Sequence, residues 1–324
     1  MITDFSISNY RCFSNLSISG LSQVNLVVGK NGSGKSALLE GIWLSKSIFP
    51  AVTCTDVLRI RDELPEEGAS ESDLLSSYKS LYLAEGHFLV SCLDDGNFYE
   101  NKVEFSMLPV RGRISIYCWD NDGNSEIDIP SILAERDYVV AGIFEPIFIP
   151  CSGFNKKALS SYWDRISLTD LEDDVTEVVK LIRPDGRRIA FIGRHPVVQI
   201  PGRGPVPMAR LGDGVLRAFG IAVAIANSSN QPLFIDEIET GIHYTAMGDL
   251  WRSVFHLASK LNVQVFATTH SWDCIKAFGE VAQTYSGTSA QLIRMERDED
   301  DAIRAVQYDR DSLVAATSQG IEVR

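Results

Sequence analysis

The segment VNLVVGKNGSGKSALLEGIWL at residues 24–44 constrains the fold more than any other part of the chain. It fits the pattern G-x-x-x-x-G-K-[ST], with an apolar, strand-like run before it and a helix-like run after it. Such a glycine-rich loop turns its backbone amides toward an anion, and the following helix adds the partial positive charge of its N-terminus. The sequence therefore predicts a phosphate-binding loop between a buried strand and a helix. The residues expected to bind the nucleotide are Gly29, Lys30, Asn31, Gly32, Ser33, Gly34, Lys35 and Ser36.

Two side chains at the end of this loop have predicted roles in the chemistry of the phosphates. Lys35 is expected to reach the β- and γ-phosphates of a nucleotide, and the hydroxyl of Ser36 is expected to ligate Mg²⁺. A preceding strand and a following helix are the context in which this pattern binds phosphate, which disfavours a chance match. The predicted ligand is ATP with Mg²⁺.

A second motif, LFIDE, ends an apolar strand with two carboxylates. Asp236 is expected to hold Mg²⁺ through water and Glu237 to polarise the attacking water, with a solvated acid pair as the alternative. One strand later, FATTHS places Thr269, His270 and Ser271 at the carboxyl end of a predicted parallel strand, where open α/β sheets bind ligands. His270 is a candidate γ-phosphate sensor, and a histidine satisfied by its surroundings is the alternative. The predicted catalytic residues are Lys35, Glu237 and His270.

The segments around these motifs predict a strand, a helix and a second strand in succession. QPLFIDE is expected to form a short strand that Pro232 can only begin, and VQVFATT is expected to form the next strand. A helix between them predicts that the two strands are parallel neighbours. A buried helix, GVLRAFGIAVAIANSS, precedes the first strand. The connecting helix has one apolar stripe, explained by core packing, made of Met247, Leu250, Trp251, Val254, Ala258 and Leu261.

The middle of the chain has a different sequence pattern. Two alternating strand pairs surround Asp95-Gly96 and Asp122-Gly123, a strong signal for β-hairpins, and predict an antiparallel sheet inserted after the first strand–helix unit. A third hairpin is expected to turn at residues 184–186, the tripeptide Pro-Asp-Gly. The predicted domains are an ATPase head, residues 1–50 and 145–324, and an inserted helical and antiparallel-β lobe, residues 51–144.

The charge of the chain is unevenly distributed. The formal net charge is −13, which argues against indiscriminate coating of nucleic acid. The stretch from Lys180 to Arg210 is nevertheless basic and is expected to lie on strands of the third hairpin. It either contacts nucleic-acid phosphates or an acidic partner, or it pairs with the protein's own acids. Its charged residues are Lys180, Arg183, Arg187, Arg188, Arg194, Arg203 and Arg210, with Asp185 as the one acid.

Cysteine usage and hydropathy indicate the compartment. Six cysteines are scattered without a C-x-x-C pair, a distribution that suits reduced thiols better than disulfides or zinc. No apolar stretch approaches the roughly 18 residues that a membrane span requires, and the N-terminus lacks the pattern of an export signal. A cytoplasmic protein without membrane contact is predicted.

Several motifs together carry a resemblance to a known family. NYRCF, EPIFIP, RLGDGVLRAF, FIDEIETGIHY, NVQVFATTHSWDCIKAF and the ending GIEVR, with the phosphate loop, resemble an ABC-type ATPase head. The resemblance is to the branch of the SMC, RecF and overcoming-lysogenization-defect (OLD) ATPases, and within it to compact prokaryotic AAA/OLD-like ATPases without a nuclease domain. It implies an α/β P-loop NTPase of ABC/SMC-head type. Its mixed central sheet would carry an antiparallel β lobe and an inserted β/helical region, and LFIDE would be the Walker B motif.

The resemblance also implies contacts for residues outside the two nucleotide motifs. Arg11 resembles the early arginine that contacts the nucleotide or the phosphate loop in SMC-type heads. Leu211, Gly212, Asp213 and Gly214 occupy the signature position, which completes the site of a second protomer. The serine of transporter-type signatures is replaced here by Gly212.

This departure shifts the expected γ-phosphate contact to backbone amides or to a neighbour such as Arg217. No Q-loop glutamine can be assigned. In IETGIH, Glu239 and His243 either face the dimer seam or form a structural cap.

The function implied is that of a Mg²⁺-dependent ATPase that forms a head-to-tail homodimer, or a higher oligomer, around ATP. The OLD branch further implies anti-phage defence or DNA maintenance with a nuclease or toxin effector on a separate chain. The alternative is a slow, nucleotide-gated interaction module that holds such a partner inactive. A transporter subunit is a weaker interpretation because the signature is altered.

Overall fold

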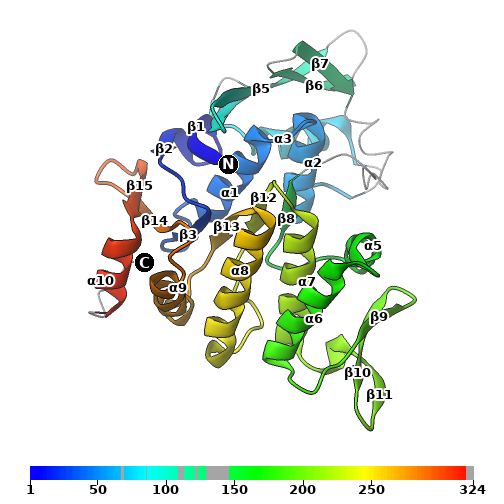
Figure 1. Ribbon diagram of the computed structural model, residues 1–324. Helices are drawn as coiled ribbons and strands as arrows, with labels where there is room; N and C mark the ends of the chain where they lie inside the picture. Colours follow the sequence, from blue (N-terminus) through cyan, green and yellow to red (C-terminus); the bar gives the residue numbers. More distant parts are fainter. Residues whose placement is uncertain (67–68, 85, 109–112, 121–122, 129–145, 319–324) are drawn as a thin grey trace.

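The computed structural model describes residues 1–66, 69–84, 86–108, 113–120, 123–128 and 146–318. Its centre is a six-stranded mixed sheet in the order β15-β14-β3-β13-β12-β8 (Figure 1). The strands from β14 to β8 are parallel, and β15 is an antiparallel edge. β12 and β13 are parallel neighbours, as predicted. The strands are β3 (Val24–Val28), β8 (Ile147–Ile149), β12 (Pro232–Ile235), β13 (Gln264–Thr268), β14 (Ala290–Arg297) and β15 (Ile303–Tyr308).

A second, antiparallel sheet has the order β2-β1-β4-β5-β6-β7. The hairpin predicted at Asp95-Gly96 is confirmed, because Asp94 pairs with Asn97. Asp122 lies outside the described residues, but the strands on either side of it pair in antiparallel fashion. The sheet joins strands from both sides of the predicted boundary between head and lobe, and the domain division stays a prediction. The strands are β1 (Ile2–Tyr10), β2 (Phe13–Ser19), β4 (His87–Asp94), β5 (Asn97–Leu108), β6 (Arg113–Asp120) and β7 (Gly123–Asp128).

Helices cover both faces of the central sheet (Figure 1). On one face, α1 (Lys35–Ser45), α2 (Pro50–Ile60) and the antiparallel sheet share a core with the inward side chains of Phe234 and Phe266. On the other face, α7, α8 and α9 pack against Leu233, Val265 and neighbouring apolar residues. The apolar stripe of α8 lies in this core, as predicted. The remaining helices are α3 (Glu71–Lys79), α5 (Lys156–Ile166), α6 (Asp170–Ile182), α7 (Asp213–Asn227), α8 (Met247–Leu261), α9 (Trp272–Thr284) and α10 (Arg310–Ser318), with short 3₁₀ helices η1 (Met208–Arg210) and η2 (Tyr244–Ala246).

A small three-stranded antiparallel sheet, β9 (Ile189–Ile192), β10 (His195–Ile200) and β11 (Gly204–Pro207), stands at the edge of the molecule (Figure 1). Phe191 attaches it to the body, with its ring centroid 6.0 Å from that of Trp163 in α5. The hairpin predicted at 184–186 is wrong. That tripeptide connects α6 to β9, and the hairpin turns at Gly193 instead.

The reason for the error lies in the residues before the tripeptide. Val175, Val178 and Val179 are buried at helical spacing, so this stretch forms α6 and not a strand. Pro184 comes two residues after the end of α6 and cannot continue the helix. The described part of the chain has no helix long and apolar enough to cross a membrane.

Candidate nucleotide site

The loop at residues 29–36 follows the fully buried strand β3 and ends at the N-terminus of α1. Gly29 has φ 147°, and a Cβ there would lie 2.5 Å from the carbonyl oxygen of Met295. Gly34 has φ 91° at the N-cap of α1, where a Cβ would lie 2.9 Å from the ring of Phe13. Both positions therefore require glycine. The predicted strand, loop and helix are confirmed, and the N-terminus of α1 faces the loop.

The side chains of the loop differ in exposure. Lys30, Asn31 and Gly32 are exposed, whereas Ser33 is buried. The backbone oxygen of Gly32 accepts a hydrogen bond from Nη2 of Arg297 at 3.3 Å, which ties the loop to β14. The side chains of Lys30 and Asn31 are thus open to solvent, while the backbone of the loop is held at Gly32.

Lys35 curls back over the loop. Its Nζ donates to the backbone oxygen of Gly29 at 2.8 Å and to that of Lys30 at 3.0 Å. Burial lowers the pKa of Lys35, and the carboxylates of Asp236 and Glu237 oppose that shift. Carbonyl oxygens hold the ammonium group in place without neutralising it, so its charge is available for an anion in the loop.

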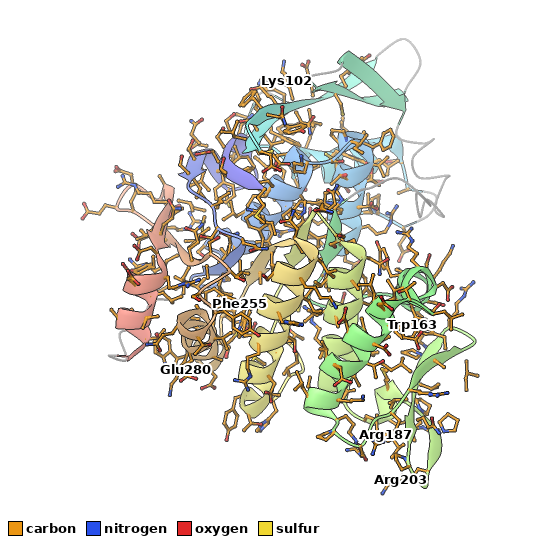
Figure 2. All side chains as sticks on the ribbon, viewed as in Figure 1. Lys102, Trp163, Arg187, Arg203, Phe255 and Glu280 are labelled. Carbon is orange, nitrogen blue, oxygen red and sulfur yellow. The ribbon has the colours of Figure 1, made fainter. Side chains whose placement is uncertain are left out.

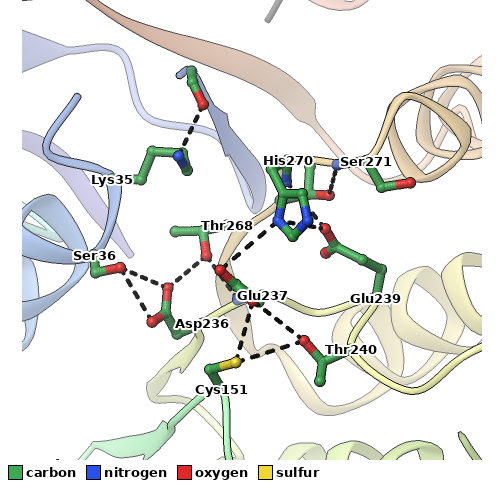
Figure 3. A network of polar contacts seen from close by, with 12 residues as sticks. Lys35, Ser36, Cys151, Asp236, Glu237, Glu239, Thr240, Thr268, His270 and Ser271 are labelled. Atoms are coloured by element: carbon green, nitrogen blue, oxygen red, sulfur yellow. Dashed lines mark hydrogen bonds and ion pairs between the residues drawn. The ribbon is translucent and has the colours of Figure 1, made fainter. Parts of the chain in front are cut away.

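Ser36 and Asp236 meet although 200 residues separate them. The hydroxyl of Ser36 donates to the two carboxylate oxygens of Asp236 at 2.9 and 3.1 Å. The hydroxyl of Thr268, at the end of β13, donates to Oδ1 of Asp236 at 2.6 Å and accepts from the backbone N–H of Glu237 at 2.7 Å (Figure 3). Thr268 therefore fixes Asp236 and Glu237 relative to each other, and Ser36 links Asp236 to the loop.

Glu237 stands at the centre of a second set of contacts. It has φ 48°, an unusual backbone conformation for a glutamate, directly after β12. The thiol of Cys151, which follows β8, donates to Oε2 of Glu237 at 3.1 Å, and the hydroxyl of Thr240 lies 3.4 Å from the same oxygen. Burial raises the pKa of Cys151, and its bond to Glu237 acts in the same direction, so the thiol remains a donor.

His270 lies beside Glu237 and Glu239 (Figure 3). Its Nδ1 is 3.8 Å from Oε1 of Glu237 and 3.3 Å from Oε1 of Glu239, and 56% of its side chain is exposed. The backbone N–H of His270 also donates to Glu239 at 3.0 Å. The prediction that the ends of β12 and β13 bring these groups together is confirmed in geometry, whereas their roles stay predictions.

The side chain of Arg217 corrects the expectation of a contact with a second protomer. It is buried, and Nη1 donates to the backbone oxygen of Pro150 at 2.8 Å. Nη2 donates to the backbone oxygens of Asp236 at 2.6 Å and Glu237 at 3.1 Å. A guanidinium held inside its own chain by three carbonyls is not presented to a partner. It instead supports the turn that carries the two acids.

The signature position lies on the surface beside that turn. Gly212 and Asp213 are exposed at the N-terminus of α7. Gly214 lies so close to the turn after Glu237 that a Cβ would be 2.7 Å from the backbone oxygen of Gly241. The exposed backbone of the signature segment therefore remains the candidate for the contact with the γ-phosphate in the site of a second protomer.

Glu239 and His243 have different surroundings. The Glu239 side chain is only 10% exposed and faces His270 of the same chain. His243 is exposed and caps η2, where its Nδ1 lies 2.9 Å from the hydroxyl of Thr245. For His243 the structure thus supplies the structural cap that was the alternative to a dimer-seam role.

Arg11 binds two acids of its own chain, and its contact with a nucleotide or with the loop stays a prediction. Its Nη1 donates to both carboxylate oxygens of Glu63 at 3.0 Å, and its Nε lies 3.2 Å from Glu40 in α1. Arg61 and the hydroxyl of Tyr10 bind the same Glu40. A buried carboxylate requires such partners. Among the described residues, Arg11 thus supports the helix that follows the loop and is not placed on the loop itself.

Thr268, Cys151 and Thr240 contact the two acids but are not among the residues predicted from the sequence. Thr268 is the first of two adjacent threonines, and a hydroxyl at the end of a buried strand is the signal available for it. Cys151 has no comparable signal, because it reaches Glu237 from a strand 86 residues earlier in the chain. The described residues contain no group of three or more His, Cys, Asp or Glu side chains arranged to hold a metal ion.

Comparisons with known proteins agree with this geometry. The model of a family described as "AAA domain, putative AbiEii toxin, Type IV TA system" matches residues 90–273, and one described as "AAA ATPase domain" matches residues 1–67. An "ATP/GTP phosphatase" of Helicobacter pylori is 24% identical over 330 residues, which cover 87% of this chain and 88% of that protein.

Solved structures of SMC heads have the same fold. The SMC head domain from Thermotoga maritima aligns with a TM-score of 0.50 at 16% identity, over 95% of this chain and 99% of that one. An SMC head bound to the C-winged helix domain of ScpA aligns with a TM-score of 0.55 at 13% identity, over 95% and 97% of the two chains. The predicted fold class is therefore confirmed.

Proposed function

This chain belongs to the AAA-domain family whose model matches residues 90–273, and from that premise we propose that it hydrolyses ATP where the loop at 29–36 meets Asp236 and Glu237. The observation that carries the proposal is the unbroken set of hydrogen bonds from Ser36 through Asp236 and Thr268 to Glu237. It joins a phosphate loop to a carboxylate pair at the carboxyl edge of a parallel sheet. The Helicobacter relative, named as an ATP/GTP phosphatase, supports the same reaction class.

The residues at the end of the loop fit Mg²⁺. Ser36 and Asp236 offer one hydroxyl and one carboxylate, hard oxygen donors 2.9 Å apart at their closest. Mg²⁺ is commonly held by one or two such groups, with waters and phosphate oxygens completing its shell. Bound there, the ion would neutralise charge on the β- and γ-phosphates.

Other residues of this chain have the remaining roles in the reaction. Lys35 binds the phosphates, and Glu237 accepts a hydrogen bond from the attacking water and orients it. His270, which is exposed and lies beside Glu237, contacts the γ-phosphate. Thr268, Cys151 and Arg217 hold the two acids in position.

The active unit we propose is a head-to-tail homodimer around two ATP molecules. The exposed backbone amides of Gly212 and Asp213 would complete the site of the partner protomer. Their support is their position on the surface at the N-terminus of α7, where a helix favours an anion. The resemblance of the signature segment to SMC-type heads supports the same arrangement.

The proposed biological setting is anti-phage defence or DNA maintenance in the cytoplasm, with a nuclease or toxin effector on a separate chain. Its support is the resemblance to the OLD branch and the toxin and TA system in the name of the matched family.

The test is the variant Glu237→Gln, which keeps the size of the side chain and removes the base. We expect ATP turnover to fall by at least about 100-fold while ATP binding persists, and the protein to elute as a dimer with ATP and Mg²⁺. Turnover is measured by phosphate release and mass by size-exclusion chromatography with light scattering. The matched control, Glu280→Gln on the exposed face of α9, should behave as the parent.

Turnover at the parental rate in Glu237→Gln would refute the role of this residue. A variant that stays monomeric with saturating ATP would refute the dimer. A parent that binds ATP but releases phosphate only slowly, with or without DNA, would favour the nucleotide-gated interaction module instead.

A further inference from the structure

The small sheet β9-β10-β11 with its flanking turns is the basic region of an acidic protein. Residues 186–212 contain five arginines and no aspartate or glutamate, in a chain of net charge −13. All five arginines are exposed, and we call them the arginine set: Arg187, Arg188, Arg194, Arg203 and Arg210.

The arginine set is not neutralised by the acids of the protein. None of its members forms an ion pair with a residue that the structure describes. The two other cations of the stretch are occupied, since Lys180 pairs with Glu177 and Arg183 with Asp185. The nearest acidic helix, α6, directs Asp174 to Lys260 of α8 at 2.8 Å. The interpretation that these arginines pair internally is therefore not supported by the described residues.

The sheet gives the arginine set a defined arrangement. Arg187 and Arg188 extend the pairing of β9, because the N–H of Arg187 donates to the oxygen of Gln199 at 2.9 Å. Arg203 lies just beyond β10 at the same end, and Figure 2 shows Arg187 and Arg203 together at the outer end of the molecule. Arg194 lies in the turn at the other end of β10. The length of β10 separates the two ends by about 20 Å.

We propose that this surface binds the phosphate backbone of duplex DNA without reading its sequence. Guanidinium groups bind phosphate oxygens in pairs of hydrogen bonds, and charges spread over about 20 Å match a rigid rod with a phosphate every few ångströms along each strand.

Other polyanions fit the surface less well. Single strands are bound by stacking on aromatic rings, but Phe191, the one aromatic residue of the small sheet apart from His195, faces Trp163 in the interior. Duplex RNA is recognised partly through 2′-hydroxyls, and the sheet offers few neutral polar side chains besides Gln199 and His195.

The surface is connected to the nucleotide site. β11 runs into η1, and η1 ends two residues before Gly212 of the signature, against α7. The next step rests on the proposed function. An ATP-bound dimer would hold two arginine sets in one particle, so DNA that spans both would bind more tightly than DNA on one protomer.

The experiment measures binding of the full chain to a fluorescein-labelled DNA duplex of about 20 base pairs, two helical turns, by anisotropy at several salt concentrations. The variant replaces Arg187, Arg194 and Arg203 by alanine. The matched control replaces Arg59, Arg252 and Arg304, three exposed arginines that each pair with a nearby acid and whose loss changes the net charge equally.

We expect the variant to bind on the order of tenfold more weakly, and the slope of log K against log salt to shrink by about 0.9 for each phosphate that is no longer bound. The control should bind nearly as the parent, and both should keep the parental ATP turnover without DNA. Equal affinity and slope in variant and control would overturn the proposal. Equally tight, arginine-dependent binding of duplex RNA or polyglutamate would overturn the assignment to DNA.

The same measurements separate this proposal from the proposed function. They are repeated without nucleotide and, in the Glu237→Gln background, with ATP. Arginine-dependent DNA binding without ATP enhancement would leave the DNA surface intact and contradict the dimer. An ATP-dependent dimer without arginine-dependent DNA binding would support the dimer and overturn the DNA surface.

Discussion

The nucleotide site and the small arginine sheet use charge in opposite ways. At the nucleotide site the charged groups of Lys35, Asp236 and Glu237 have hydrogen-bond partners that hold them, as Thr268 holds Asp236. Arg217 holds the turn that carries the two acids. In the arginine set the side chains are exposed and make no ion pair within the described structure. Ligand binding at the nucleotide site therefore depends on geometry, whereas ligand binding by the arginine set depends on the number of charges.

This comparison predicts different responses to conservative substitutions. At the nucleotide site, a change that preserves charge or size but alters hydrogen bonding should be costly. On the arginine sheet, a change that preserves charge should have little effect, because exposed guanidiniums adjust to phosphates in several geometries.

The largest effect is expected for Lys35→Ala. Its ammonium lies over the loop, held by carbonyls alone, so its removal eliminates the charge that faces the phosphates. We expect ATP affinity to fall by roughly 100-fold or more, with the fold intact. Isothermal titration with ATP and Mg²⁺ measures the affinity, with Lys79→Ala, an exposed lysine of α3 outside the site, as the control. Undiminished affinity would contradict the assignment of the phosphate loop.

Arg217→Met is expected to act on stability. It leaves the carbonyl oxygens of Pro150, Asp236 and Glu237 without their buried donor, which should cost about 2–4 kcal/mol. Urea unfolding followed by circular dichroism measures the decrease. Arg210→Met, an exposed arginine a short distance earlier in the chain, is the control. If both variants unfold at the same urea concentration, Arg217 does not support the turn.

Thr268→Val tests the link between the two acids. Valine keeps the shape of threonine but removes the hydroxyl that donates to Asp236 and accepts from the N–H of Glu237. We expect kcat to fall by about 10- to 100-fold with a smaller change in ATP affinity. Thr268→Ser, which restores the hydroxyl, should recover most of the rate. Equal rates for the two variants would show that packing, and not the hydrogen bonds, matters at this position.

The smallest effect is expected for Arg194→Lys on DNA binding. The charge in the exposed turn is preserved, so affinity should change by less than about twofold and the salt slope should stay the same. Arg194→Gln, which removes the charge, should lower the slope by about 0.9. A lysine variant as weak as the glutamine variant would mean that this arginine makes a geometrically specific contact, and the contrast between the two regions would fail there.

Much of the nucleotide site is predictable because its signals are local. The glycines of the loop, the apolar strand before it and the helix after it occupy one continuous segment. LFIDE and FATTHS are separated by one helix, and the rule that such strands are parallel neighbours places Asp236 and His270 at the same edge. The apolar stripe of α8 follows from helical periodicity in the same way.

Other features depend on contacts between distant segments. The position of Arg217 just after the signature suggests a contact with a partner, but helix α7 turns this side chain inward to carbonyls that follow two strands. Arg11 binds Glu40 and Glu63, and nothing in the sequence indicates that these acids surround it. The Asp-Gly signal at 185–186 is typical of a hairpin, yet the amphipathic α6 precedes it.

The sequence by itself determined the phosphate loop, the carboxylate pair, the parallel pairing of the two strands that end in LFIDE and FATTHS, and the location of surplus positive charge. Each of these depends on neighbouring residues or on a rule that connects consecutive elements. Only the tertiary structure decided which groups hold Glu237 in place and which arginines of the described chain lack an ion pair. Those outcomes depend on hydrogen bonds and ion pairs between segments as far apart as Cys151 and Glu237, and such pairings are selected by the packing of the whole chain.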